Sequence, residues 1–253
     1  MNRTTWGLLA MCLSLLLGTA IAVGSLISTG GQLDTADLAA NPMNVPTLLV
    51  TCLDPLAILL EIAAIVLVLS DARQYGTLHH RLAWAAAALY LLWAAANLLG
   101  FLPLSLLSMQ NGSLEMALAG QWVKAGAALL AYTVPALLVF GLGDRTTRAG
   151  LVLGWLISAI GNFATLARTI PAIALEPVVT GDRTMYAVQF SVDYTGGIYP
   201  LLLALGYTGG ALYLAAYLYL AWGQMRARRV GQAAPGASGI DGAASLADLG
   251  QQP

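Results

Sequence analysis

Six long apolar stretches constrain the fold of this chain more than any other feature. They cover about residues 6–27, 47–70, 82–107, 122–142, 149–170 and 198–222. A helix of roughly 20 residues crosses the hydrocarbon core of a bilayer, and a spanning segment must satisfy its own backbone hydrogen bonds. The stretches are too long and too uniformly apolar for the alternating strands of a membrane barrel. The sequence therefore predicts an all-α membrane protein, a bundle of six transmembrane helices in a lipid bilayer.

The composition agrees with this interpretation and excludes one class of partner. The chain is 58% hydrophobic and only 9% charged, whereas about a quarter of the residues in a soluble domain are charged. Its formal net charge of −1 leaves no basic face for neutralising phosphates, so we expect no nucleic-acid partner. We assign residues 1–225 to the transmembrane domain. Residues 226–253 are rich in Gly, Ala, Ser and Gln, and we expect a disordered tail there.

The basic residues predict the orientation, because cytoplasmic loops are enriched in Lys and Arg. With the N-terminus inside, eight of the 11 Lys and Arg residues fall on the cytoplasmic side: Arg3, Arg73, Arg81, Arg145, Arg148, Arg226, Arg228 and Arg229. Both termini are then cytoplasmic, in a plasma (inner) membrane. The cluster Arg226, Arg228 and Arg229 would meet anionic headgroups at the membrane surface.

The first apolar stretch also admits a second interpretation, as a cleavable signal peptide. Small residues at 19–22 resemble a cleavage site, and cleavage would leave five spans and an external N-terminus. The apolar run nevertheless continues to about Ile27, which is long for a signal sequence. We therefore favour an uncleaved first span.

Two further patterns concern the connections and the helix contacts. Between the fifth and sixth helices, the β-prone residues 178–179 and 185–190 flank a turn at 180–182, which predicts a small extracytoplasmic β-hairpin. Two pairs of glycines four residues apart predict close helix packing, Gly150 with Gly154 and Gly206 with Gly210.

Polar residues inside the spans are the candidates for function, because ionisable groups are costly in lipid. Asp54 and Glu61 lie seven residues apart on the second span, so they share a helix face and are separated by about 10 Å along the axis. Glu61 falls near the membrane midplane. Other spans place further polar groups in the outer half of the bundle: Asn97, Lys124, Asn162 and Arg168. If these faces converge, they form a polar cavity that opens outward and narrows towards Glu61, with Tyr90 and Tyr132 at its lower part.

Each of these residues also has a purely structural interpretation. Lys124 and Arg168 can extend their charged ends to the headgroups. Asn97 and Asn162 can hydrogen-bond between helices, and Asp54 can pair with Lys124. Glu61 is the hardest to explain in this way, since no countercharge is expected at its depth.

The sequence argues against metal centres, cofactors and catalysis. His79 and His80 are the only histidines and are expected at the basic end of a cytoplasmic loop, so no histidine-ligated haem, zinc or copper site is expected within the bundle. Cys12 and Cys52 lie in apolar runs and are expected to be free thiols. There is no nucleophile elbow and no phosphate-binding glycine loop. We expect no enzyme activity, no metal and no cofactor.

Two functional hypotheses remain. The first is a small transporter or sensor that binds a cation, a proton or a small solute in the outward-facing cavity. The second is a non-catalytic structural or accessory subunit that packs against other membrane subunits. Six spans can form a monomeric bundle, and a homo-oligomer is equally compatible with the sequence.

Overall fold

The computed structural model describes residues 2–34, 45–180 and 183–232, and its main feature is six helical spans. They are α1 (Arg3–Ser28), α3 (Val45–Asp71), the third span α4–η2–α5, α6 (Leu114–Phe140), α7 (Arg145–Thr169) and α8 (Tyr199–Gln232). The third span consists of α4 (Thr77–Ala95), η2 (Ala96–Phe101) and α5 (Leu102–Asn111). All six are long and apolar enough to cross a membrane, which confirms the predicted number of helices of that kind.

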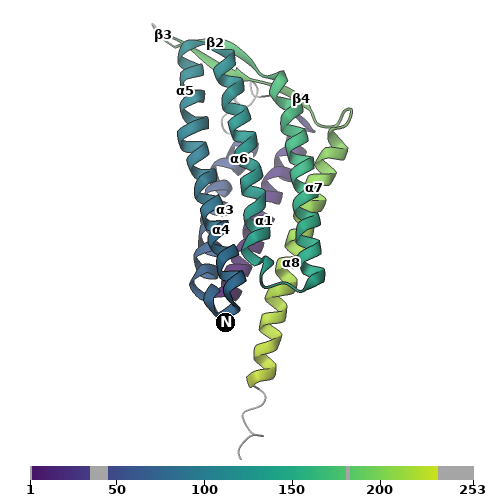
Figure 1. Cartoon of the computed structure of the whole chain (residues 1–253). Coiled ribbons are helices and arrows are strands. Elements are labelled where there is room, and N and C mark those ends of the chain that lie inside the picture. Colours follow the sequence, from purple (N-terminus) through teal and green to yellow (C-terminus); the bar gives the residue numbers. More distant parts are fainter. Residues whose placement is uncertain (1, 35–44, 181–182, 233–253) are drawn as a thin grey trace, which may run out of the picture.

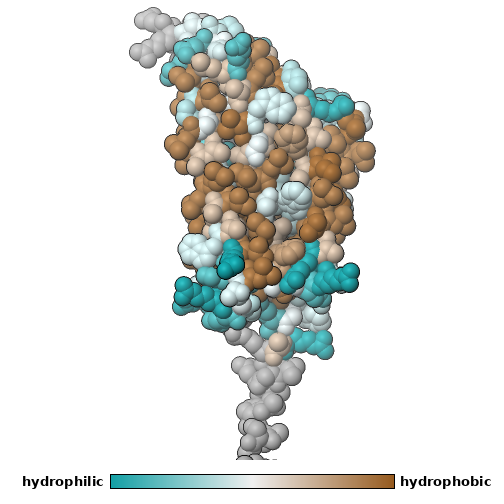
Figure 2. Space-filling model, viewed as in Figure 1, coloured by the Kyte–Doolittle hydropathy of each residue, from teal (hydrophilic) through white to brown (hydrophobic). Residues whose placement is uncertain are grey.

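The bundle is elongated, with different structures at its two ends (Figure 1). The start of α1 and the end of α8 lie at one end, here called the terminal end, whereas the strands lie at the other, the sheet end. Figure 2 shows hydrophobic side chains over the middle of the visible face and hydrophilic ones towards both ends. This distribution is the one expected of a protein that crosses a bilayer.

Two small antiparallel sheets cover the sheet end. β2 (Ala174–Thr180) pairs with β3 (Arg183–Gln189) between α7 and α8, so the predicted hairpin is present and its strands are longer than expected. The second sheet was not predicted: β1 (Gln32–Asp34), after α1, pairs with β4 (Ser191–Asp193), before α8. The backbone N–H of Tyr194 donates a hydrogen bond to the carbonyl of Gly31 at 2.8 Å and extends this pairing.

The helices pack mainly as antiparallel pairs: α1 with α3, α4 with α6, and α7 with α8. Contacts of α1 with α8 and of α6 with α7 join the pairs into one bundle. The largest cluster of buried side chains lies in the terminal half and includes Leu8, Val68, Leu138, Leu151 and Tyr217.

Glycines bring α7 and α8 close together, but not in the pairs that the sequence predicted. A Cβ atom at Gly161 would lie 2.7 Å from the backbone N of Gly206, and one at Gly154 would lie 3.2 Å from the carbonyl oxygen of Gly209. Gly150 and Gly210 have no neighbouring atom within 4 Å of such a Cβ. One member of each predicted pair is therefore at the contact, and the other is not.

Pro103 and Pro135 lie within the helical spans. In the third span, η2 is a π-helical segment that ends just before Pro103, and the N–H of Leu102 bonds to the carbonyl of Asn97, five residues back. Proline has no N–H and its ring crowds the carbonyl four residues earlier, which the wider π turn accommodates. In α6, the hydroxyl groups of Tyr213 and Tyr217 donate hydrogen bonds at 2.8 Å to the carbonyls of Tyr132 and Pro135. These bonds tie the region of the proline to α8.

At the terminal end, the predicted position of His79 is wrong, and Asp71 makes a buried contact that was not predicted. His79 is not in a loop: it lies in the first turn of α4, is 1% exposed, and meets the ring of Tyr75 edge-on at 5.6 Å. Asp71 is also buried, and its carboxylate accepts hydrogen bonds from the N–H and hydroxyl of Thr4. A carboxylate at the start of α1 satisfies free backbone donors and complements the helix dipole.

The last helix runs further than the predicted transmembrane domain. α8 continues to Gln232, so residues 226–232, which we assigned to the tail, are helical. Arg226 is exposed and its guanidinium lies 5.5 Å from the ring centroid of Trp222. The side chains of Arg228 and Arg229 and the tail at 233–253 lie outside the described part of the chain.

Candidate ligand-binding pocket

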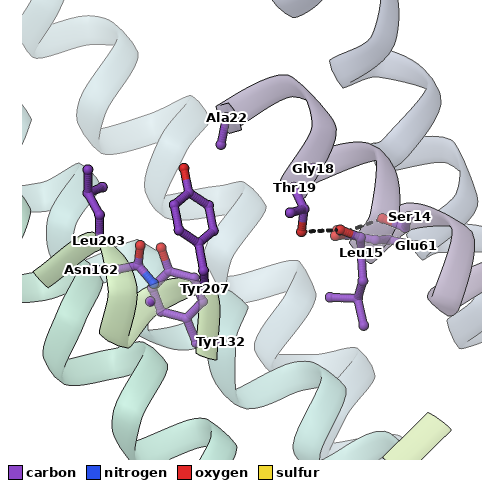
Figure 3. Close-up of a pocket in the computed structure, with 11 residues that line it drawn as sticks. Ser14, Leu15, Gly18, Thr19, Ala22, Glu61, Tyr132, Asn162, Leu203 and Tyr207 are labelled. Carbon is purple, nitrogen blue, oxygen red and sulfur yellow. Dashed lines mark hydrogen bonds between the residues drawn. The ribbon is translucent and has the colours of Figure 1, made fainter. Parts of the chain in front are cut away.

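A pocket of about 300 Å³ lies among the helices near the middle of the bundle and contains Glu61. Its lining comes from α1, α3, α6, α7 and α8: Ser14, Leu15, Gly18, Thr19, Ala22, Glu61, Tyr132, Asn162, Leu203, Gly206 and Tyr207. In Figure 3, Glu61 and the residues of α1 lie on one side of the space, and Tyr132, Asn162, Leu203 and Tyr207 lie on the other. The pocket is therefore bounded by helices from both halves of the sequence.

The pocket extends from Glu61 towards the sheet end. The lining residues of α1 recur along one face from Ser14 to Ala22, which spans about 12 Å at 1.5 Å per residue. Ser14 is level with Glu61, and α1 runs from the terminal end to the sheet end. Glu61 therefore lies at the end of the pocket nearer the termini.

Glu61 is half-buried and is held by α1. The hydroxyl of Ser14 lies 3.2 Å from its Oε1 and 3.1 Å from the carbonyl oxygen of Ala57, so this donor can serve either acceptor. Tyr90 of α4 lies beside the carboxylate, and its hydroxyl is buried. No basic side chain of the described residues lines the pocket. The pocket therefore holds a carboxylate without a countercharge.

Asn162 lies across the pocket on α7. Its Nδ2 donates to the carbonyl of Ser158 in its own helix at 2.9 Å. Gly206 faces this amide, and a Cβ there would lie 3.2 Å from Nδ2 and 3.3 Å from Oδ1. The glycine thus leaves room for the amide at the pocket wall.

Of the six predicted ligand residues, only Glu61 and Asn162 line this pocket. Asp54 is exposed on α3. Asn97 lies in η2 of the third span, where its Nδ2 donates to the carbonyl of Trp93 at 2.8 Å. Lys124 is exposed on α6, and its Nζ lies 5.1 Å from the ring centroid of Phe101 rather than beside Asp54. Tyr132 lines the pocket as predicted. Tyr90 does not line it, but its side chain lies next to Glu61.

Arg168 belongs to a different hollow at the sheet end. It is exposed near the end of α7 and lines a space of about 350 Å³ with β4 and the start of α8. Asp193 lines the same space, but its Oδ1 already accepts hydrogen bonds from the N–H and hydroxyl of Thr195. Arg168 therefore takes no part in the Glu61 pocket.

Several lining residues were missed because their types are ordinary in membrane helices. Ser14, Gly18 and Ala22 follow a four-residue spacing that any small-residue helix contact would show. Tyr207 could have been read as an interfacial aromatic residue. Only their position in the same pocket distinguishes them: the α1 residues lie on the side of Glu61, and Tyr207 lies opposite.

The described residues offer little to a metal ion. They contain no group of three or more His, Cys, Asp and Glu side chains arranged to hold one. Cys12 is buried, Cys52 is exposed, and both are free thiols. Comparison of the chain with protein-family models, with characterised proteins and with solved structures gives no match.

Proposed function

We propose that this protein binds a cationic ligand in the Glu61 pocket and acts as a small transporter or sensor. The observation that carries the proposal is a half-buried carboxylate that lines a pocket with no basic side chain among its described lining residues. Leaving a carboxylate without a countercharge is costly in a membrane interior. A proton, a metal cation or an organic cation in the pocket would supply the missing charge.

The proposed orientation places the terminal end in the cytoplasm and the sheet end outside a plasma membrane. It is supported by the basic residues Arg3, Arg73, Arg81 and Arg145, which are exposed at the terminal end, because cytoplasmic ends are enriched in Arg and Lys. In this orientation the pocket extends outward from Glu61.

The test is chemical labelling of Glu61 together with measurement of currents. A hydrophobic carbodiimide modifies protonated carboxyl groups, and intact-protein and peptide mass spectrometry locates the modified residue. We expect labelling at Glu61 to slow when a cation that binds is present. In proteoliposomes, a step in cation concentration or pH should produce a current or a labelling change that Glu61→Gln abolishes.

Two controls make the outcome decisive. Glu115→Gln removes an exposed carboxylate from the first turn of α6, does not touch the pocket lining and should change neither readout. Glu61→Gln should remain folded, because the amide oxygen can still accept a hydrogen bond from the Ser14 hydroxyl. Wild-type protein that shows no response of labelling or current to pH or to any cation would refute the proposal.

The second candidate, an accessory subunit, is favoured by the surface of the hairpin. Val178 and Met185 are paired across β2 and β3, and they are 45% and 41% exposed. Apolar side chains on a sheet outside the membrane mark a surface that a partner subunit could cover. Native mass spectrometry after mild extraction distinguishes the two: stoichiometric additional chains that Val178→Thr with Met185→Thr removes would support the accessory role.

A further inference from the structure

The size and lining of the Glu61 pocket indicate which class of cation it would bind. We propose that the ligand is a small organic ammonium ion, an inference that rests on the proposed function. A volume of about 300 Å³ is at the lower end of the range for small-molecule sites. It has room for a cation with several carbon atoms, and Leu15, Ala22 and Leu203 provide apolar walls for them.

The pocket offers two kinds of interaction to an ammonium ion, a negative charge and aromatic rings. Glu61 supplies one negative charge at the terminal-side end of the pocket. Tyr132 and Tyr207 lie on the opposite side in Figure 3. Tyrosine rings attract ammonium groups through their negative faces, and this interaction is stronger in desolvated sites. One carboxylate facing two tyrosines therefore suits a monovalent cation with an apolar surface.

The same residues suit an inorganic cation poorly. Calcium takes six to eight oxygen ligands and magnesium requires near-octahedral geometry. The pocket offers one carboxylate, and the described residues contain no metal-ligating group of three or more such side chains. A bare metal ion would make no apolar contact with Leu15 and Leu203. The lining thus favours an organic ligand over a metal ion.

The experiment compares choline with its uncharged isostere, the dimethylbutanol in which carbon replaces the ammonium nitrogen. Binding to the purified full chain in detergent is measured by titration calorimetry and by protection of Glu61 from the carbodiimide. We expect choline to bind at least about tenfold more tightly than the alcohol, and Glu61→Gln to weaken choline binding by at least about tenfold, as expected for losing a charged partner. Glu115→Gln, the control at an exposed carboxylate, should bind like the wild type.

A second variant tests the need for space without touching the charge. Gly18 lines the pocket, and a Cβ there would meet no atom within 4 Å, so Gly18→Leu projects a side chain into the empty volume. It should abolish choline binding while carbodiimide still labels Glu61. Gly126→Leu is the matched control, because Gly126 is exposed on α6, also has open space and does not line the pocket.

The outcomes separate this inference from the proposed function. Choline binding that is lost in both Glu61→Gln and Gly18→Leu would support the organic ligand. The inference is overturned if choline fails to bind, if it binds no better than the alcohol, or if Gly18→Leu leaves its binding intact. Should metal ions still protect Glu61 in that case, or should a pH step still produce a current that Glu61→Gln abolishes, the proposed cation site stands with a different ligand. If no cation protects Glu61 and no such current appears, both proposals fail.

Discussion

Adding one methyl group at Gly161 should separate two helices that the structure holds in close contact. A Cβ at this position would lie 2.7 Å from the backbone N of Gly206, 2.7 Å from the carbonyl oxygen of Leu202 and 3.1 Å from the Cβ of Leu205. Two of these neighbours are backbone atoms, which cannot rotate away as a side chain can. Gly161→Ala therefore forces α7 and α8 apart.

The size of the effect follows from the distances and from a matched variant. Ordinary contact begins at 3.4 Å, so the local gap must widen by about 0.7 Å. Overpacking of this kind costs about 1–3 kcal/mol. Replacing glycine by alanine in a helix interior also stabilises the helix by about 1 kcal/mol through helix propensity. Gly150→Ala gains the same propensity in the same helix, but its new Cβ meets no neighbour within 4 Å. The difference between the two variants isolates the packing cost.

The assay is reversible unfolding in mixed micelles, in which SDS is titrated into a mild detergent and helicity is followed by circular dichroism. We expect the free energy of unfolding of Gly161→Ala to fall about 1–3 kcal/mol below that of Gly150→Ala. Asn162 is the next residue, so the displaced helix should also weaken ligand binding in the pocket. Equal stability of the two variants, within about 0.5 kcal/mol, would refute the close contact between α7 and α8.

Two further predictions concern single hydrogen-bonding groups. Tyr217→Phe removes the buried hydroxyl that donates to the carbonyl of Pro135 and should lower the unfolding free energy by about 0.5–1.5 kcal/mol. Tyr219→Phe, at a 55% exposed position, should change it by less than about 0.5 kcal/mol, and similar losses in both would contradict the assignment. Asp144 caps α7, and the hydroxyl and N–H of Thr147 hold the pKa of this carboxyl below its ordinary value of 3.8. A lowered pKa in the folded state means that the stabilisation is present above the unfolded pKa and is lost as the pH falls through the folded pKa. Asp144→Ala should therefore lower the Tm near neutral pH, and the difference in Tm between the variant and the wild type should become smaller below pH 3.8. A difference in Tm that does not change with pH would contradict this.

Hydropathy predicted the spans well because the cost of exposing a polar backbone to lipid acts on each helix separately. The starts and ends of α1, α3 and α7 lie within a few residues of the predicted limits. The β2–β3 hairpin could also be predicted, since it is local and rich in β-prone residues. The β1–β4 pairing joins Gln32 to Asp193, and three-residue strands so far apart in the sequence carry no local signal.

The candidate site could be predicted only in part, because depth in the membrane can be estimated from sequence but the direction around the helix axis cannot. Glu61 and Asn162 were placed at a suitable depth, and both line the pocket. Asn97 also lies in the middle of its span, yet its amide donates to the carbonyl of Trp93 in that same span and does not line the pocket. Helices surrounded by lipid can be apolar on all sides, so periodicity does not show which face meets a neighbour.

The short β1–β4 ladder has a mechanical consequence for the whole bundle. It joins the segment that leaves α1 to the segment that enters α8, which are the first and last helices of the chain. Any movement that spreads these two helices at the sheet end must break the backbone hydrogen bonds of the ladder. A movement that spreads them at the terminal end can leave the ladder intact and use it as a hinge. The pairing therefore favours movements that separate α1 and α8 at the terminal end over movements that separate them at the sheet end.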